Sequence, residues 1–299
     1  MHAELSKRVG PKLLGMGGYR PAMPAAPHWL LASPLALAYG LFFAAPLLLL
    51  AWISLHEDAE LTRMGFATWA KFLGDPFYVG VVIKTLKLGI ITVIAASVLS
   101  YPVALVYYTA GPRVRRILLF VVLLPLLTSV VVRTFAWIAL LSREGVANTL
   151  LQSSGLTTAP VPLLQTELGL VIALMQIEMP LMLLPLLAVM QRIDPRLVEA
   201  SRALGASKWR TLAKVLIPLS LPGWVAGATL VFASSTTAFI SQSVIGGGRL
   251  VYLPTVIWQQ AMVLYDWPFA AVASMMLLAC VLGGVVLLGL LGRWISREA

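Results

Sequence analysis

Glu199 to Thr211 reads EASRALGASKWRT, a polar and basic segment between two long apolar stretches of the chain. The flanking stretches are hydrophobic enough to lie in a bilayer, so this segment must lie at a membrane surface. Gly205 divides it, which predicts a short helix, a glycine break and a second short helix. A water-facing helix–turn–helix in a membrane protein suits the docking of a soluble partner.

The composition of the whole chain excludes a soluble domain. Hydrophobic residues make up 60%, charged residues 11%, and the mean hydropathy is +0.90. The length of 299 residues provides for about six membrane spans. The single Cys280 lies in an apolar run, which excludes a disulfide framework, and the three histidines are too scattered to form a metal site.

The hydrophobic runs predict an all-α membrane protein with six transmembrane helices. The predicted spans are residues 29–55, 88–108, 117–141, 168–191, a part of 215–248, and 267–292. Two charged residues fall inside them: Arg133 in the third span and Glu178 in the fourth.

The distribution of basic residues predicts the topology. With a cytoplasmic amino terminus, fifteen of the 22 lysines and arginines lie on the inner side. We therefore expect both termini in the cytoplasm, residues 1–28 as a cytoplasmic tail and residues 29–299 as the transmembrane domain. The basic charge then reports membrane orientation, and nucleic acid is not an expected partner.

The polar segment is the centre of a predicted cytoplasmic loop, residues 192–215, between the fourth and fifth spans. Asp194 and Pro195 are typical of a helix start, since aspartate accepts hydrogen bonds from free amides and proline fits the first turn. Gly205 is suited to ending that helix, and Ser207 to capping the next. From these residues alone, a solvated amphipathic connector and a docking element both remain open.

The spacing of this loop resembles the EAA loop of ABC-importer permeases. That pattern is Glu-Ala-Ala, three residues, Gly, nine residues, Ile, one residue, Leu-Pro. The chain has Glu199-Ala200-Ser201, then Gly205, then Val215 and Ile217-Pro218 at the same spacing. The departures are Ser201, Val215 and Ile217, all of which are mild changes in size.

A second stretch, Arg133-Thr134-Phe135-Ala136-Trp137, resembles the first permease subunit of spermidine/putrescine-type importers. The resemblance extends over roughly residues 80–295. It implies a permease subunit in a bacterial inner membrane, a transport protein and not an enzyme. It also implies a second, related permease, two copies of a cytosolic ATPase that bind ATP and Mg, and a periplasmic substrate-binding protein. The chain has no phosphate-binding loop of its own, so no cofactor is expected on it.

The resemblance further implies which residues of the loop transmit ATPase movements to the spans, with the coupling helix between the fourth and fifth helices. Glu199 is expected to make a polar contact at the ATPase groove, Gly205 to provide the turn, and Leu204 and Trp209 to provide apolar contact. The full expected coupling set is Glu199, Ala200, Ser201, Leu204, Gly205, Ala206 and Trp209.

Glu178 departs from the family pattern, which is usually apolar at this position. An ionised side chain in a span needs a partner, a proton or water. Two interpretations stay open: Glu178 pairs with Arg133 as a structural feature, or it faces the substrate path and attracts a cationic substrate. The small polar residues Ser234, Thr237 and Ser241, predicted to share one helix face, are the other path candidates, and helix packing is the alternative role for them.

The sequence therefore predicts half of the substrate path of a binding-protein-dependent ABC importer for polyamines or similar small cationic nitrogen compounds. The same machinery importing opine-like amino acid derivatives or aminophosphonates is the alternative. A self-sufficient secondary transporter is the alternative of another class. It is less favoured because only Glu178 and Arg133 supply charges inside the spans.

Overall fold

The computed structural model describes residues 28–298 of the chain. Within this range, residues 28–49 and 50–298 belong to two separate compact units. The predicted cytoplasmic tail lies outside the described residues, apart from His28. Within 28–298 the regular structure is helical, apart from one isolated antiparallel bridge between His56 and Met64.

The first unit begins with a continuous helical segment. Helix α1 (His28–Tyr39), a π-helical turn η1 (Gly40–Ala44) and α2 (Ala45–Ile53) follow one another directly, and α2 runs into the second unit. Residues Ser33–Ile53 are long and apolar enough to cross a membrane. This matches the first predicted span.

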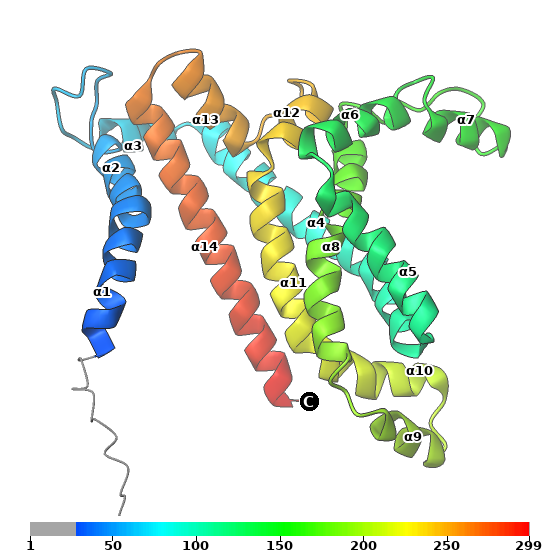
Figure 1. Cartoon of the computed structure of the whole chain (residues 1–299). Helices are drawn as coiled ribbons and strands as arrows, with labels where there is room; N and C mark the ends of the chain where they lie inside the picture. The colour runs from blue at the N-terminus through cyan, green and yellow to red at the C-terminus, as the bar shows by residue number, and fades with distance from the viewer. Residues whose placement is uncertain (1–27, 299) are drawn as a thin grey trace, which may run out of the picture. The chain divides into compact units, whose positions relative to one another are not determined.

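The second unit is built around long helices that pack against one another (Figure 1). They are α4 (Pro76–Thr109), α8 (Glu167–Met190), α11 (Ile217–Thr237) and α14 (Trp267–Glu298). Helix α8 packs on both α4 and α11, and α14 packs on α11. A short helix, α3 (Ala67–Gly74), precedes α4, where Asp75 accepts a hydrogen bond from the Phe77 amide and Pro76 begins the helix.

The third predicted span, residues 117–141, is wrong as a single continuous helix. The chain forms α5 (Pro112–Leu123), a 3₁₀ turn η2 (Leu124–Leu127) and then α6 (Val130–Leu141). Its direction changes by 102° between Pro112–Leu127 and Val130–Ser153. Pro125 lacks an amide hydrogen, and the Ser129 hydroxyl accepts from the Val131 amide at 3.3 Å, so the helix stops and a new one starts. The described residues thus contain five helices long enough to cross a membrane, or six if this bent pair is one span.

The fifth span, predicted to lie within residues 215–248, corresponds to α11 and occupies the first part of that run. Helix α11 stops at Thr237, and α12 (Phe239–Gly246) starts after Ala238, whose ψ of 61° is not helical. Gly247, with a φ of +57°, ends α12, and α13 (Leu253–Met262) leads towards α14. On the other side of the bundle, α7 (Val146–Ser153) follows α6.

Small residues allow the closest helix contact in the bundle, between α8 and α11. A Cβ added to Gly227 would lie 2.7 Å from the Met182 carbonyl oxygen, and one at Gly223 would lie 2.8 Å from that of Pro185. Glycine is therefore required at both positions for the two backbones to approach this closely.

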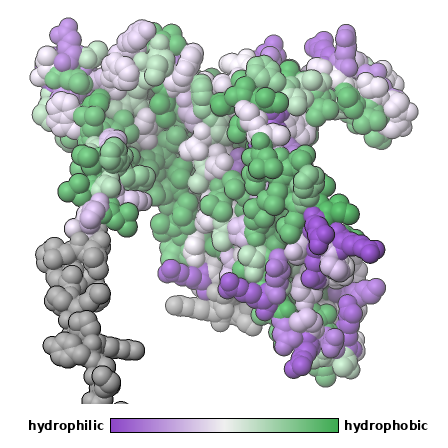
Figure 2. All heavy atoms as spheres, in the orientation of Figure 1, coloured by the Kyte–Doolittle hydropathy of each residue, from purple (hydrophilic) through white to green (hydrophobic). Residues whose placement is uncertain are grey.

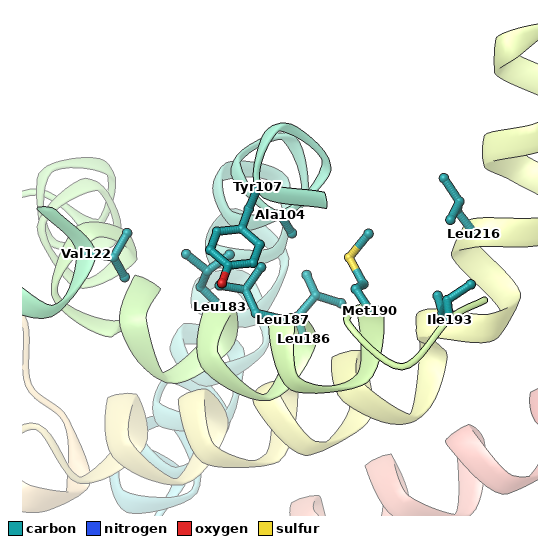
Figure 3. Close-up of a cluster of buried hydrophobic side chains, with 9 residues drawn as sticks. All are labelled: Ala104, Tyr107, Val122, Leu183, Leu186, Leu187, Met190, Ile193 and Leu216. Atoms are coloured by element: carbon teal, nitrogen blue, oxygen red, sulfur yellow. The ribbon is translucent and has the colours of Figure 1, made fainter. Parts of the chain in front are cut away.

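A cluster of buried apolar side chains joins α4, α5 and α8 to the chain that follows α8 (Figure 3). It contains Tyr107, Met190, Ile193 and Leu216, with further leucines of α8. Hydrophilic residues gather at the same end of the unit, below the apolar surface of the bundle (Figure 2). This end carries α9 (Pro195–Ala203) and α10 (Lys208–Thr211), which form the first part of the candidate site.

Candidate functional site

The segment 192–215 folds as two short helices around a glycine, as its sequence predicts. The Asp194 carboxylate accepts from the Arg196 amide at 2.9 Å and caps α9. Gly205 has a φ of +81°, in the left-handed region. The Ser207 hydroxyl accepts from the Arg210 amide at 3.3 Å and caps α10, which continues through a π-helical turn, η3 (Leu212–Leu216), into α11.

Two hydrogen bonds fix the angle between α9 and α10. The hydroxyls of Ser201 and Thr211 lie 3.0 Å apart, and Thr211 is buried. The Ala206 amide donates to the Ser201 carbonyl oxygen at 3.1 Å. The serine that replaces the family's alanine in the Glu-Ala-Ala triplet therefore makes a contact that alanine lacks.

Large apolar side chains on this segment face the solvent. Leu204 is 89% exposed and Trp209 is 79% exposed, one on each side of Gly205. Glu199 and Ala200 are exposed as well. Exposed apolar side chains next to charged ones are typical of a surface that a partner protein covers.

The second part of the candidate site lies within the bundle, around Glu178. This residue is 3% exposed, and its carboxylate accepts a hydrogen bond from the Ser234 hydroxyl at 3.0 Å. Glu178 lies on α8 and Ser234 on α11, so the bond joins two of the packed helices.

The predicted ion pair between Arg133 and Glu178 is not formed. Arg133 donates from Nη2 to the Thr128 carbonyl oxygen at 3.0 Å and from Nη1 to the Ile177 carbonyl oxygen at 3.5 Å. Thr128 lies at the break between η2 and α6, where carbonyl groups lose their helical partners. The guanidinium group therefore donates to one carbonyl at the break and to one within α8.

All four predicted path residues line one pocket of about 600 Å³: Glu178, Ser234, Thr237 and Ser241. Arg133 lines it too. The prediction of a single helix face is wrong for Ser241, because the break at Ala238 puts this residue on α12. Its hydroxyl lies 3.3 Å from that of Thr134 on α6.

The lining also includes residues that the sequence analysis did not identify, among them Thr128 and Phe239. The Phe239 ring stacks on Trp258 of α13 with centroids 5.9 Å apart. Both residues reach the pocket because a helix breaks next to them. Pro125 was the available signal for the first break, whereas nothing in the sequence around Ala238 marks the second.

The arrangement can bind and position a ligand. Among residues 28–298, no group of three or more His, Cys, Asp or Glu side chains is placed to hold a metal ion. The pocket instead combines one buried carboxylate, the guanidinium group of Arg133, four hydroxyls (Thr128, Ser234, Thr237 and Ser241) and apolar walls. Such a lining suits a small polar molecule with an apolar chain and a positive charge.

Comparison with known proteins extends these observations. Residues 96–297 match the family described as binding-protein-dependent transport system inner membrane component. The spermidine/putrescine transport system permease protein PotB of Escherichia coli (strain K12) is 33% identical over 224 residues, 74% of this chain and 81% of that protein. PotB of Haemophilus influenzae is 33% identical over 202 residues, 68% of this chain and 71% of that protein.

Among solved structures, a bacterial ABC transporter involved in the import of the acidic polysaccharide alginate shares the fold. The TM-score is 0.74 at 17% sequence identity, over 90% of this chain and 96% of that one. The chain therefore belongs to the binding-protein-dependent transport system inner membrane components: it is a multi-pass inner-membrane permease of an ABC importer, which works with a separate ATPase and a periplasmic binding protein.

Proposed function

We propose that this chain forms half of the substrate path of a polyamine importer, with a second, related permease forming the other half. Its six spans place both termini and the 192–215 loop in the cytoplasm, counting the bent pair α5–α6 as one span. The excess of arginine and lysine at this end of the bundle supports this orientation.

The α9–α10 segment is the proposed docking element for the ATPase. The exposed side chains of Leu204 and Trp209 provide apolar contact, and the exposed Glu199 provides a polar one. Gly205 fixes the angle between the helices. Two ATPase copies, one on each permease, would close on ATP binding and move these helices.

The pocket around Glu178 is the proposed substrate path. A buried carboxylate with a single hydroxyl partner attracts an ammonium group, because a charge in the bilayer gains from any opposite charge. Arg133 lines the same pocket but donates to backbone carbonyls and forms no ion pair with the carboxylate. Similarity to the two PotB proteins supports putrescine or spermidine as the substrate.

Uptake of labelled putrescine and spermidine tests the proposal, in vesicles that contain this chain with its partner permease, ATPase and binding protein. We expect ATP-dependent uptake, and we expect Glu178→Gln to lower it at least about tenfold, since a charge-assisted hydrogen bond contributes roughly 1.5–3 kcal/mol. Glu144→Gln, an exposed residue between α6 and α7, is the matched control.

Assembly must be measured in the same samples, by co-purification of the ATPase. Lost uptake with intact assembly supports the path role of Glu178. Equal uptake by Glu178→Gln and the unaltered protein contradicts it. An assembled complex that imports neither polyamine, but imports an opine or an aminophosphonate, refutes the proposed substrate and keeps the permease.

A further inference from the structure

A second pocket, of about 490 Å³, lies where α4 ends, α5 begins and α8 leads into α9. Its wall combines apolar surface, from Tyr107, Met190 and Val198, with the charged side chains of Arg115, Arg202 and Glu199. The polyamine path and the exposed apolar pair Leu204 and Trp209 are not part of it. Of its lining residues, the transport cycle described above uses Glu199, which is the proposed polar contact to the ATPase.

Arg115 is held firmly in the wall. Its Nε donates to the Tyr107 carbonyl oxygen at 2.9 Å, and its Nη2 donates to that of Tyr108 at 2.8 Å. Its guanidinium group also lies 5.5 Å from the centre of the Tyr107 ring. These contacts cap the end of α4 and fix the position of a full positive charge.

Arg202 faces the same pocket from α9, and no ion pair or hydrogen bond of its side chain is formed within the described chain. Glu199 is one helical turn away, yet the two side chains are not paired. Among the residues that line the pocket, two arginines, Arg115 and Arg202, face one carboxylate, that of Glu199. This excess of positive charge favours an anion.

The apolar side of the pocket is continuous with the buried cluster in Figure 3. Tyr107, Met190 and Ile193 belong both to that cluster and to the pocket wall. Gln191 donates to the Tyr107 hydroxyl at 3.2 Å and ties the ring to the end of α8. A ligand in this pocket meets cations on one side and apolar surface on the other, so it should itself be amphiphilic.

We propose that this pocket binds the phosphate of an anionic phospholipid from the inner leaflet, with Arg115 and Arg202 contacting the phosphate and the glycerol end lying against Tyr107 and Met190. Basic pockets between spans on the cytoplasmic side are suited to such headgroups. The inference rests on the proposed orientation, which puts the end of α4 at the cytoplasmic surface. Because Arg202 lies on α9, a bound lipid would hold the ATPase-docking segment against the membrane.

Lipid retention tests this inference. The complete complex is purified from vesicles of phosphatidylcholine with phosphatidylglycerol, and retained phosphatidylglycerol is counted by native mass spectrometry. We expect Arg202→Gln to lower retention about fivefold, the effect of roughly one interfacial cation. Arg202 is the better choice for substitution, since Arg115 also caps α4.

Arg196→Gln is the matched control, because it removes the same charge from the same helix at a position outside the pocket wall. An equal loss in both variants indicates general surface attraction and overturns the site. Unchanged retention in Arg202→Gln also overturns it. Displacement of the lipid by glycerol phosphate in solution would assign the pocket to a soluble phosphate compound, and loss of the lipid on ATPase binding would assign it to the ATPase contact.

The outcome is separable from that of the proposed function. Lipid retention by the complete complex is measured without transport or substrate, so the result stands even if polyamine uptake fails. An impermeant thiol reagent that labels Ala110→Cys from outside would refute the orientation on which both proposals depend.

Discussion

Single residues shape the pocket within the bundle and the 192–215 loop in different ways. In the proposed substrate path Glu178 acts through its charge: it is the acidic residue of the pocket lining, 3% exposed and bonded to Ser234. Gly205 acts through its backbone, because only glycine adopts a φ of +81° without strain. A glycine with open space around it, such as this one, is required for its conformation and not for packing.

Substitution of Gly205 by alanine is therefore expected to strain the turn by about 1 kcal/mol or more and to shift α10 relative to α9. ATPase co-purification should fall while the amount of folded permease in the membrane stays the same. Gly74→Ala is the control, since Gly74 ends α3 with open space and without a left-handed φ. Equal ATPase recovery in the two variants would show that the turn tolerates another geometry.

At the scale of elements, close helix packing stabilises the bundle, and the hydrogen bonds of one buried asparagine hold the loop that follows α6. Helices α8 and α11 approach through Gly223 and Gly227. Asn148 holds the loop after α6: its amide donates at 3.0 Å to the carbonyls of Ser142 and Val161, and its oxygen accepts from the Val161 amide at 2.8 Å. The glycine contacts hold α8 and α11, which carry Glu178 and Ser234, and the Asn148 hydrogen bonds hold the loop that leads from α6 to α8.

Gly227→Ala should separate α8 from α11, because the new methyl group would lie 2.7 Å from the Met182 carbonyl oxygen. We expect a loss of about 1–3 kcal/mol in the free energy of unfolding, measured as a lower Tm of the purified protein. Gly283→Ala on α14 is the control, because a Cβ there meets nothing within 4 Å. A Tm that falls equally in both would contradict the packing argument.

Asn148→Ala should loosen the loop that follows α6. The change leaves a buried amide and two carbonyls without their partner, at a cost of roughly 1–3 kcal/mol. Limited proteolysis from the outer side should cut the loop faster in this variant. Ser153→Ala, at an exposed position of α7, should be cleaved at the original rate. Equal cleavage rates in the two variants would contradict a stabilising role of the Asn148 hydrogen bonds.

At the scale of the whole molecule, two helices connect the ATPase-docking segment to the substrate pocket. Helix α8 carries Glu178 and leads into α9, and α11 carries Ser234 and follows α10 through η3. Their close packing and the bond between Glu178 and Ser234 join the two helices. In the proposed transport cycle, a displacement of α9 and α10 would therefore be transmitted to the pocket through these two helices.

Trp209→Ala is expected to weaken the ATPase by about 2 kcal/mol, or roughly thirtyfold in affinity, since exposed tryptophans at interfaces often dominate binding. Stability of the permease should be unchanged within about 0.5 kcal/mol, because the side chain is 79% exposed. Titration of the ATPase onto the purified permease pair measures the affinity. Leu156→Ala, 74% exposed on the external loop, is the control, and a loss of affinity there as large as at Trp209 would refute a specific docking surface.

The sequence by itself determined the class of the protein, the approximate positions of the spans and the two-helix form of the 192–215 loop. These properties depend on composition and on local rules, namely hydrophobic length, helix caps at Asp194 and Ser207, and the left-handed turn at Gly205. The tertiary structure decided where helices break and which buried groups meet. Arg133 donates to the Thr128 carbonyl, which is freed at a helix break, and to the Ile177 carbonyl of α8, and forms no ion pair with Glu178. Ser241 reaches the pocket from α12 because the break at Ala238 redirects the side chains that follow it. Such contacts depend on atoms brought together from distant segments, and no local pattern in the chain predicts them.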